Sequence, residues 1–407
     1  MLSHKKFLLK AAVLTVVVLL FVTFVNRMFV MKKYYDTTWP STSSFADFYQ
    51  LDKNTVDVLF LGSSHGVSSF SPPKLYDDYS IRSYNLSSEL QSLLVSYYWL
   101  KEALRYQTPK VVVLDTYIAY PYSVPDVLNS AEPATRISID SMRWSKNKIE
   151  AVNDIASLDE RQSKESYYFT NIRFHTRWKD LNENDFTFWE MDAHGKSTGG
   201  LKGFSALSKY CGIEYLPFQK EMSEEKAEMV PLMQEYLNRI VSLCKEQGIE
   251  LILVKTPTVQ TNIAKYNTLV DYAEENGIPY IDFNEEEIYQ SCNFDFSKDA
   301  ADGEHLNIWG AEKITDYMGR YFEEHCKIEK RSDAQWDSSS AYYAGIKKNC
   351  ALSKVVDMNE YLQMIQDDRY TVFMSIKGEG VNSLNDAIKS NLKALGLTSD
   401  FDKENRI

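Results

Sequence analysis

Short apolar segments recur along this chain and alternate with longer segments of helical periodicity. Five of them have the length and continuity of strands that are buried on both faces: residues 56–62, 81–87, 111–117, 249–257 and 279–284. Amphipathic stretches separate them, and Gly or Pro marks most of the turns. This alternation predicts an α/β fold in which helices cover both faces of a five-stranded parallel sheet.

Several connecting segments predict helices. Residues 93–106 are amphipathic, a second helix ends at Gly248, a typical helix-stop residue, and a third covers residues 267–277. Between the third and fourth strands, roughly residues 118–225, the chain is rich in Tyr, Trp and charge and lacks obvious strands. A connection of this length predicts an insertion over one end of the sheet, where substrate contacts are usually found.

The first 33 residues form a separate region with an apolar run. An uncharged stretch at residues 11–25 extends over residues 7–30, which approaches the ~20 residues that a helix needs to span a bilayer. Lys10 and Arg27 lie near its ends, where long basic side chains can reach the headgroups. A cleaved signal peptide is the alternative, but no small-x-small cleavage site follows the run. We therefore expect residues 1–33 to be a short tail and an uncleaved transmembrane anchor.

Positive residues flank the anchor on both sides, so the positive-inside rule gives nearly a tie. The tail is very short and the domain that follows is large, which favours a cytoplasmic tail. The expected location is the cell membrane, with a single pass and with the sheet domain outside the cytoplasm. Residues 34–55 would be a juxtamembrane linker before the sheet domain, which covers residues 56–327.

The chain beyond the sheet domain changes character. Residues 328–345 are polar and weakly patterned, which predicts a linker. In residues 346–407 two helical patterns flank one strand-like segment at residues 370–378. About sixty residues with one clear strand can bury only a thin core, so we expect a small, partial α+β domain.

Composition and charge narrow the function classes. With 407 residues, 44% of them hydrophobic, the chain can bury a large core, and wholesale disorder is excluded. A net charge of −12 without a basic stripe argues against nucleic acid as a partner. The five cysteines are dispersed and form no C-x-x-C pair, so neither a zinc site nor a disulfide framework is indicated. No metal and no cofactor are predicted.

The first strand ends on an unusual group of polar residues, the GSSH motif at residues 62–65. Ligands bind at the carboxyl ends of parallel strands, so Ser64 is well placed for a nucleophile. A serine hydroxyl needs a base, which a third group must orient. The DGEH motif at residues 302–305 supplies both, because Asp302 can hold the ring of His305 in the tautomer whose free nitrogen faces the serine. Two unrelated polar turns are the alternative, but the strand context and the chain order favour catalysis.

These motifs make the chain similar to the SGNH (GDSL-type) hydrolases. GSSH stands where that family has its Gly-Asp-Ser block, and DGEH matches its Asp-x-x-His block. The resemblance covers the sheet domain apart from the insertion. It implies a three-layer α/β/α fold, with Ser64 as the nucleophile, His305 as the base and Asp302 as the group that orients the base.

The likeness is incomplete at the oxyanion hole, the group of donors that stabilises the negative oxygen of the transition state. Where the family's second block offers a glycine amide, this chain has Ser87 and Ser88, and either backbone amide could donate. Ser64 is expected to contribute as well. The asparagine of the third block is missing, since the third strand ends in LDTY. Asn85, Thr116 or a residue of the insertion are the candidates to replace it.

Three further residues are candidates for substrate binding. His65 follows the nucleophile and either touches substrate or simply begins a helix. His175 and Arg177 lie in the insertion, where they could bind an acidic or sugar substrate. An amphipathic helix with a buried ring edge explains these two residues nearly as well.

Divergent SGNH members share the departure in the third block, among them the D-alanyl-lipoteichoic acid biosynthesis and alginate acetylation types. They also resemble this chain in having an N-terminal membrane anchor, and they work outside the cytoplasm, often with a membrane-bound O-acyltransferase. The segment YTVFMSIKGEGVNSLNDAIKSNLKALGL near the C-terminus is similar to part of the interleukin-like EMT inducer domain, a lectin-like module.

The resemblance therefore implies a membrane-anchored serine esterase or O-acyltransferase that acts on a cell-surface polysaccharide or teichoic-type polymer through an acyl-serine intermediate. Hydrolysis and transfer would use the same residues, so the sequence leaves both open. The alternative is a non-catalytic, SGNH-like scaffold that presents glycan to a membrane-bound O-acyltransferase. A third possibility, a cytoplasmic lipid esterase, would require the opposite orientation of the anchor.

Overall fold

The computed structural model describes residues 2–29, 41–120, 132–186, 198–220, 223–375 and 384–397. The chain divides into two compact units, Met1–Tyr343 and Ala344–Ile407, and the larger one contains the sheet.

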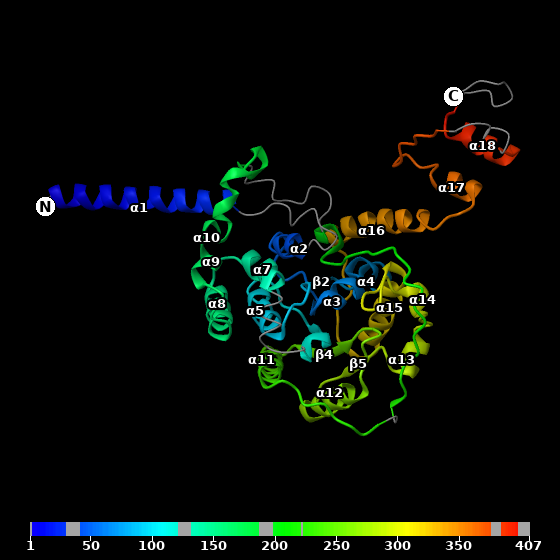
Figure 1. The fold of residues 1–407 in the computed structure, drawn as a ribbon, viewed down its shortest axis with the longest axis horizontal. Helices are drawn as coiled ribbons and strands as arrows, with labels where there is room; N and C mark the ends of the chain where they lie inside the picture. The colour runs from blue at the N-terminus through cyan, green and yellow to red at the C-terminus, as the bar shows by residue number, and fades with distance from the viewer. Residues whose placement is uncertain are drawn as a thin grey trace. The chain divides into compact units, whose positions relative to one another are not determined.

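The sheet of the larger unit has five parallel strands in the order β2-β1-β3-β4-β5 (Figure 1). Their bounds are β1 (Val58–Leu61), β2 (Ser83–Asn85), β3 (Val111–Asp115), β4 (Glu250–Lys255) and β5 (Tyr280–Asp282). Each lies inside one of the predicted apolar segments, so the five-stranded parallel sheet is confirmed. The strands are shorter than the predicted segments because the residues at the ends of each segment lie in buried turns.

The strand order creates a point where the chain changes direction. From β1 it moves outward to β2, then returns to the other side of β1 as β3 and continues to β4 and β5, so that Leu59 of β1 lies opposite both Tyr84 and Val112. In open parallel sheets, ligands bind at the carboxyl ends of the strands at such a reversal. Here the reversal lies between the ends of β1 and β3.

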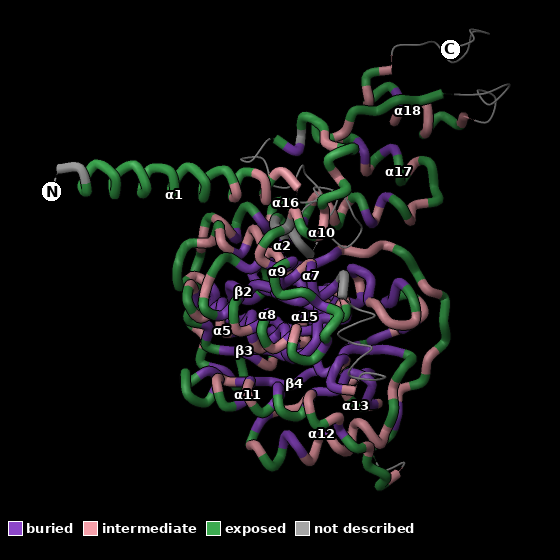
Figure 2. Tube along the Cα trace, turned by 60° about the vertical axis from the view of Figure 1, so that its left-hand side comes forward, coloured by how far each residue is buried: buried purple, intermediate pink, exposed green. Residues whose placement is uncertain are grey.

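Alternate residues of each strand enter two separate cores, as expected for a sheet that is buried on both faces. Leu59 and Leu61 of β1 pack with α5 (Leu93–Ala103), α8 (Lys146–Leu158) and α11 (Pro231–Gln247). Val58 and Phe60 pack on the other face with α4 (Pro72–Tyr79) and α15 (Ile308–His325). Figure 1 shows these helices on opposite sides of the strands, and the strands are buried in Figure 2. The α/β architecture with helices on both faces is thus confirmed.

The predicted helix boundaries follow from identifiable caps. Gly248 ends α11 in a left-handed conformation with φ +65°, as predicted for a helix-stop residue. Gly277 ends α12 (Ile263–Asn276) in the same way, and the side chain of Asn262 caps its beginning by accepting a hydrogen bond from the amide of Lys265.

Helix α15 begins with a more elaborate cap, Asn307, which is fully buried. Its Oδ1 accepts hydrogen bonds from the amides of Trp309 and Gly310, both at 3.1 Å, and its Nδ2 donates to the carbonyls of Lys298 and Lys209 at 2.6 and 3.0 Å. One side chain thus joins the helix to two other segments of the chain.

We expect Asn307→Ala to lower the free energy of unfolding by about 2–4 kcal/mol, because it removes a cap and leaves buried backbone groups unpaired. Asn262→Ala, the equivalent change at a cap with a single side-chain bond, should cost about 1 kcal/mol. Urea unfolding followed by tryptophan fluorescence measures both. Equal losses would show that the additional bonds of Asn307 contribute nothing.

The described part of the predicted insertion is helical or irregular, in agreement with the expected lack of strands. Helices α7 (Glu132–Ser141) and α8 pack beside α5, so they extend a helical layer on one face rather than cover the end of the sheet. The later segment does approach that end, because the amide of Ser205 donates to Val67 and the amide of Ile308 donates to Leu207. Helices α7 and α8 pack on α5 because this contact buries their apolar faces.

The N-terminal helix α1 (Leu2–Phe29) is long and apolar enough to cross a membrane, and most of residues 4–29 are exposed (Figure 2). The predicted linker that follows contains a helix, α2 (Ser41–Phe48), which buries Phe45 and Phe48 in the core. Phe45 stacks on Trp99 with 4.4 Å between the ring centroids. Residues 41–48 therefore belong to the sheet domain, whereas residues 34–40 lie outside the described residues.

Residues 328–345 were expected to form an irregular linker. From residue 334 on, they form instead the first part of a helix, α16 (Ala334–Leu352). Trp336 is fully buried in the core of the sheet domain, and its Nε1 donates to the carbonyl of Ser83 at 3.1 Å. Tyr343, later in the same helix, is also buried and packs edge-on against Phe204, so two aromatic rings attach this segment to the sheet domain.

The smaller unit is helical where it is described. It contains α17 (Met358–Met364) and α18 (Asp386–Ala394), which bury Leu362 and Leu392 in a small cluster. The predicted strand is not formed at residues 370–375, and residues 376–378 lie outside the described residues. A strand needs a neighbour for its backbone groups, and the described residues of this unit provide none.

Candidate active site

The GSSH motif forms a tight turn between β1 and the short helix α3 (Ser64–Ser69). Gly62 has φ +154°, and a Cβ at this position would lie only 2.4 Å from Cβ of Asp115. Glycine is therefore required for the ends of β1 and β3 to approach each other. As a result, Ser64 is the first residue of α3, at the reversal point of the sheet.

Asp115, the last residue of β3, holds this turn in place. Its Oδ2 accepts hydrogen bonds from the amide and the hydroxyl of Ser63, at 3.1 and 2.6 Å, while Oγ of Ser63 caps the helix by accepting from the amide of His65. Burial raises the pKa of the Asp115 carboxyl, although the bonds from Ser63 and Tyr117 oppose this rise. Sequence reasoning overlooked Asp115, and the available signal was a carboxylate at the end of a buried strand.

The structure brings Ser64, His305 and Asp302 together, and these three residues are called the Ser64 cluster below. Nε2 of His305 lies 2.9 Å from Oγ of Ser64, a residue 241 positions away in the chain. Nδ1 of His305 lies 3.0 and 3.1 Å from the two carboxylate oxygens of Asp302. The imidazole thus bridges a hydroxyl and a carboxylate, which is the arrangement that activates serine nucleophiles.

The electrostatics of Asp302 suit this position. Burial alone would raise the pKa of its carboxyl, but hydrogen bonds from the amide of Glu304 and from His305 outweigh burial and lower the pKa. The amides of Glu304 and His305 both lie 2.8 Å from Oδ1. Asp302 is therefore ionised at neutral pH and can accept a proton-bearing Nδ1 of His305.

The loop that carries His305 is fixed at both ends. A bridge pairs Ala300 with Leu306, and the amide of Ala301 donates to the carbonyl of His305 at 2.8 Å. Two residues beyond His305, the buried cap Asn307 begins α15. The position of the imidazole is thus determined by backbone bonds and not by its contact with Ser64 alone.

His65 lies in the first turn of α3, as expected, but its ring is fully buried beside the Ser64 cluster. It stacks on Tyr117 at 3.7 Å between centroids and lies 5.4 Å from the ring of His305. Its Nδ1 is 3.4 Å from Oγ1 of Thr256. Burial, and then the positive charges of Lys255 and His305, lower the pKa of His65 well below its usual value, so the ring is neutral.

The residues that contact His65 come from the ends of two strands: Tyr117 follows β3, and Thr256 follows β4. Lys255, the last residue of β4, places Nζ 4.6 Å from the centroid of the Tyr117 ring, and burial lowers the pKa of its ammonium group. Sequence reasoning noted Lys255 and Thr256 by position only and overlooked Tyr117. Only the strand order shows that these residues meet His65.

The structure does not support Asn85 or Thr116 as replacements for the missing oxyanion-hole side chain. Nδ2 of Asn85 donates to the carbonyls of Gly66 and Phe70, at 2.8 and 3.3 Å. The amide and the hydroxyl of Thr116 both donate to the carbonyl of Val254. Both side chains connect the sheet to its neighbours because buried donors must find acceptors.

The predicted backbone donors differ in availability. The amide of Ser87 donates to Oδ1 of Asn85 at 3.1 Å, and the amide of Ser88 donates to the carbonyl of Gly62 at 3.1 Å. Both are thus already engaged. The amide of Ser64 is the first of α3, and the first amides of a helix have no acceptor within the helix. Ser64 is therefore the best placed of the predicted backbone donors.

His175 and Arg177 are engaged elsewhere, in the 3-10 helix η3 (His175–Lys179). His175 is exposed, and its Nδ1 lies 2.9 Å from the carbonyl of Ile172. Arg177 donates to a carboxylate oxygen of Asp185 at 2.6 Å and to the carbonyl of Phe29 at 2.9 Å. These contacts give Arg177 a structural role and do not join either residue to the Ser64 cluster.

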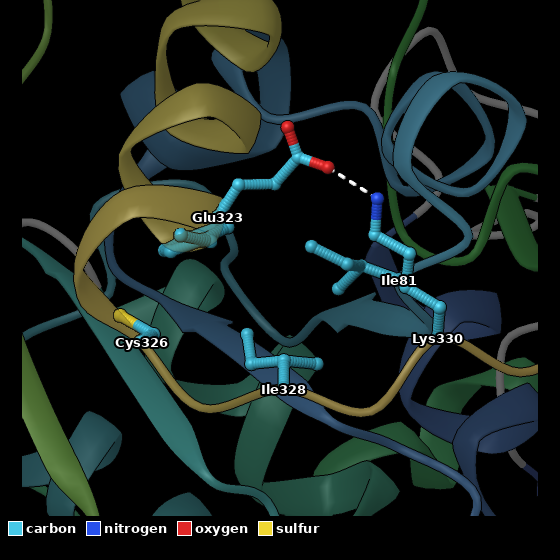
Figure 3. A pocket seen from close by; sticks show the side chains of 6 residues that line it. Ile81, Glu323, Cys326, Ile328 and Lys330 are labelled. Atoms are coloured by element: carbon cyan, nitrogen blue, oxygen red, sulfur yellow. Dashed lines mark hydrogen bonds and ion pairs between the residues drawn. The ribbon is translucent and has the colours of Figure 1, made fainter.

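A cavity of about 280 Å³ lies at the opposite, amino-terminal edge of the sheet, and Figure 3 shows the ion pair of Glu323 with Lys330 across it. Burial raises the pKa of the Cys326 thiol there to about 12, which makes it a poor nucleophile. The cavity is lined by Ile81, Phe322, Glu323, Cys326, Ile328 and Lys330. It offers no chemistry comparable with that of Ser64 and His305.

No known family model matches this chain, and no curated protein is significantly similar to it in sequence. The function must therefore be inferred from the sequence motifs and from the geometry of the Ser64 cluster.

Proposed function

We propose that the chain is a membrane-anchored serine esterase or O-acyltransferase that forms an acyl-serine intermediate on Ser64. The observation that carries the proposal is the 2.9 Å contact between Oγ of Ser64 and Nε2 of His305, with Asp302 bound to the opposite ring nitrogen. A hydroxyl, an imidazole and a carboxylate in this order can generate an alkoxide-like nucleophile at neutral pH.

The reaction would proceed in two steps. Oγ of Ser64 attacks an ester carbonyl, and Nε2 of His305 accepts the hydroxyl proton while Asp302 stabilises the imidazolium. The carbon–oxygen bond to the leaving alcohol then breaks, and His305 protonates that alcohol. Water or a sugar hydroxyl, deprotonated by the same imidazole, then attacks the acyl carbon. The bond from that carbon to Oγ of Ser64 breaks, His305 returns the proton to Oγ, and the acid or the acylated sugar is released.

The carbonyl oxygen becomes negative during each attack. The amide of Ser64 lies at the start of α3, where the free amides of the first turn carry partial positive charge. This amide is the donor that the proposal assigns to the oxyanion hole. Mutational loss of one such donor typically lowers the rate by about 10²- to 10³-fold, so a site with few donors would act slowly or on activated esters.

The substrate class follows from two weaker arguments. Helix α1 is long and apolar enough for a membrane anchor, and the motifs resemble those of SGNH members that modify cell-envelope polymers. We therefore propose a cell-surface polysaccharide or teichoic-type polymer as the substrate, outside the cytoplasm. A membrane-bound O-acyltransferase would be the partner that supplies or receives the acyl group.

Labelling with a fluorophosphonate probe tests the proposal, because the probe reacts with activated serines without requiring the natural substrate. We expect the full chain in detergent to be labelled and Ser64→Ala to show no labelling. Ser69→Ala is a matched control on the same helix. Oγ of Ser69 is buried and has no hydrogen-bond partner in the described part of the chain, so its removal should cost little.

A scaffold that presents glycan without catalysis is the second candidate, because Asn85, Thr116, Ser87 and Ser88 are engaged in structural bonds. Folded wild-type chain that remains unlabelled would favour the scaffold over the enzyme. Labelling that persists in Ser64→Ala would instead show that another serine is the nucleophile.

A further inference from the structure

We propose that a binding site for a divalent transition-metal ion, zinc above all, lies beside the Ser64 cluster and is formed by His65, Glu304 and His305, the last of which the two sites share. One ligand atom from each of the three side chains lies within 4.8 Å of the other two. His65 comes from the first turn of α3, and the other two residues come from the DGEH loop. The site exists only because the fold joins these two segments.

The ring of His65 supplies the observation that points to a ligand. Its Nδ1 lies 3.4 Å from the hydroxyl of Thr256, whereas its Nε2 is buried and has no hydrogen-bond partner among the residues that the structure describes. A buried polar atom without a partner costs about 1–3 kcal/mol, so it requires an explanation. A metal ion bound at Nε2 would use this lone pair.

The surroundings of His65 also suit a metal ligand. The ring stacks on Tyr117, and the hydroxyl of Thr256 lies beside the ring nitrogen that would not bind the metal. Contacts of this kind fix the orientation of a ligating imidazole. The histidine is therefore held in place before any ion binds.

The donor set selects the type of metal. Two imidazoles and one carboxylate form a common zinc site with one open position, while calcium and magnesium prefer sites made of oxygen ligands. One oxygen of Glu304 contacts the side-chain amide of Gln260, which leaves the second oxygen for the ion. Ser64 lies beside the proposed site, because its hydroxyl is 2.9 Å from His305.

Metal binding would compete with the proposed catalysis, and this consequence rests on the proposed function. Nε2 of His305 has one lone pair, which either accepts the proton of Ser64 or binds the metal. With zinc bound, Ser64 loses its base, so zinc should slow fluorophosphonate labelling. The ion would thus act as a reversible inhibitor.

Calorimetric titration of the full chain in detergent with zinc chloride tests the site directly. We expect one ion per chain, and a dissociation constant that rises about tenfold or more in Glu304→Gln and in His65→Gln. Glu323→Gln, which removes a carboxylate at the opposite edge of the sheet, should bind as the wild type does. Calcium and magnesium should not displace the zinc.

The outcomes separate this proposal from the proposed function. Ser64→Ala retains all three ligands, so it should bind zinc even though it cannot be labelled. An unlabelled wild type that still binds zinc through Glu304 would overturn only the enzyme. Absence of binding, or equal binding by Glu304→Gln and Glu323→Gln, would overturn the metal site. Glu304 is partly exposed, so its variant tests the site even if the buried His65→Gln fails to fold.

Discussion

Replacing His305 with alanine is expected to lower kcat/KM toward p-nitrophenyl acetate by about 10⁴- to 10⁶-fold, the range seen when members of a catalytic serine triad are removed. Nε2 of His305 lies 2.9 Å from Oγ of Ser64. Among the described residues, it is the only base close enough to accept the hydroxyl proton. Without it, the hydroxyl remains protonated at neutral pH and is a weak nucleophile. The release of p-nitrophenolate by the full chain in detergent measures the effect.

His325→Ala is the matched control, because His325 lies at the exposed far end of α15, whose first turn follows His305. Its removal should leave the rate unchanged. Asp302→Asn should lower the rate by about 10⁴-fold, since an amide can hold the imidazole in the wrong tautomer. A His305→Ala variant that folds and retains the wild-type rate would contradict the proposed mechanism.

The second large effect concerns stability. We expect Asp57→Ala to lower the free energy of unfolding by about 3 kcal/mol, the lower end of the range for broken buried ion pairs, because it leaves the buried Arg82 with only its 3.3 Å contact to Asp333. Asp57 is 4% exposed and accepts hydrogen bonds from Nε of Arg82 at 3.0 Å and from Arg331 at 2.6 Å. Guanidinium chloride unfolding, followed by circular dichroism, measures the loss.

Asp78→Ala is the control for that experiment. Asp78 forms an ion pair with Lys74 on the surface of α4, one helical turn away, and such exposed pairs contribute less than about 1 kcal/mol. Similar losses in the two variants would show that the ion pairs of Asp57 add little. A large difference would identify the amino end of β1 as a point where residues 331–333 are attached to the sheet.

The fold illustrates which sequence signals are strong. Each of the five apolar segments contains a strand. A strand that is buried on both faces is continuously apolar, so a short apolar run is a reliable signal for it. Gly248 stopped its helix because glycine adopts the left-handed conformation without strain. These signals act over a few residues, so they can be read without knowledge of the tertiary structure.

The secondary-structure predictions that differ from the structure concern segments whose conformation depends on contacts with distant parts of the chain. Residues 334–345 lack helical periodicity in their apolar side chains, yet they form part of α16 because Trp336 inserts into the core. Residues 370–375 have the composition of a strand but have no neighbour to pair with in the described part of their unit. Residues 41–48 were expected to lie in a linker. They form a helix that packs on the core because Phe45 stacks on Trp99 and Phe48 contacts the ring of Tyr84.

The candidate site shows the same division. Ser64, His305 and Asp302 could be named from the sequence because a strand end and a turn before a helix restrict where their side chains can lie. The roles of the surrounding polar residues could not, since Asn85 and Thr116 find their acceptors only in the folded chain. The spacing of cysteines, on which the expectation of no metal rested, carries no information about a site built from two histidines and a glutamate.

The sequence by itself thus determined the α/β class, the five strands, the apolar N-terminal helix and the three residues of the Ser64 cluster. Only the tertiary structure decided that Asp115 holds the turn, that His65 is buried beside His305, and that the predicted oxyanion-hole side chains are already bonded. The physical reason is distance along the chain. Periodicity and turn chemistry act between near neighbours, whereas hydrogen-bond partners and burial depend on segments that can lie more than 240 residues apart.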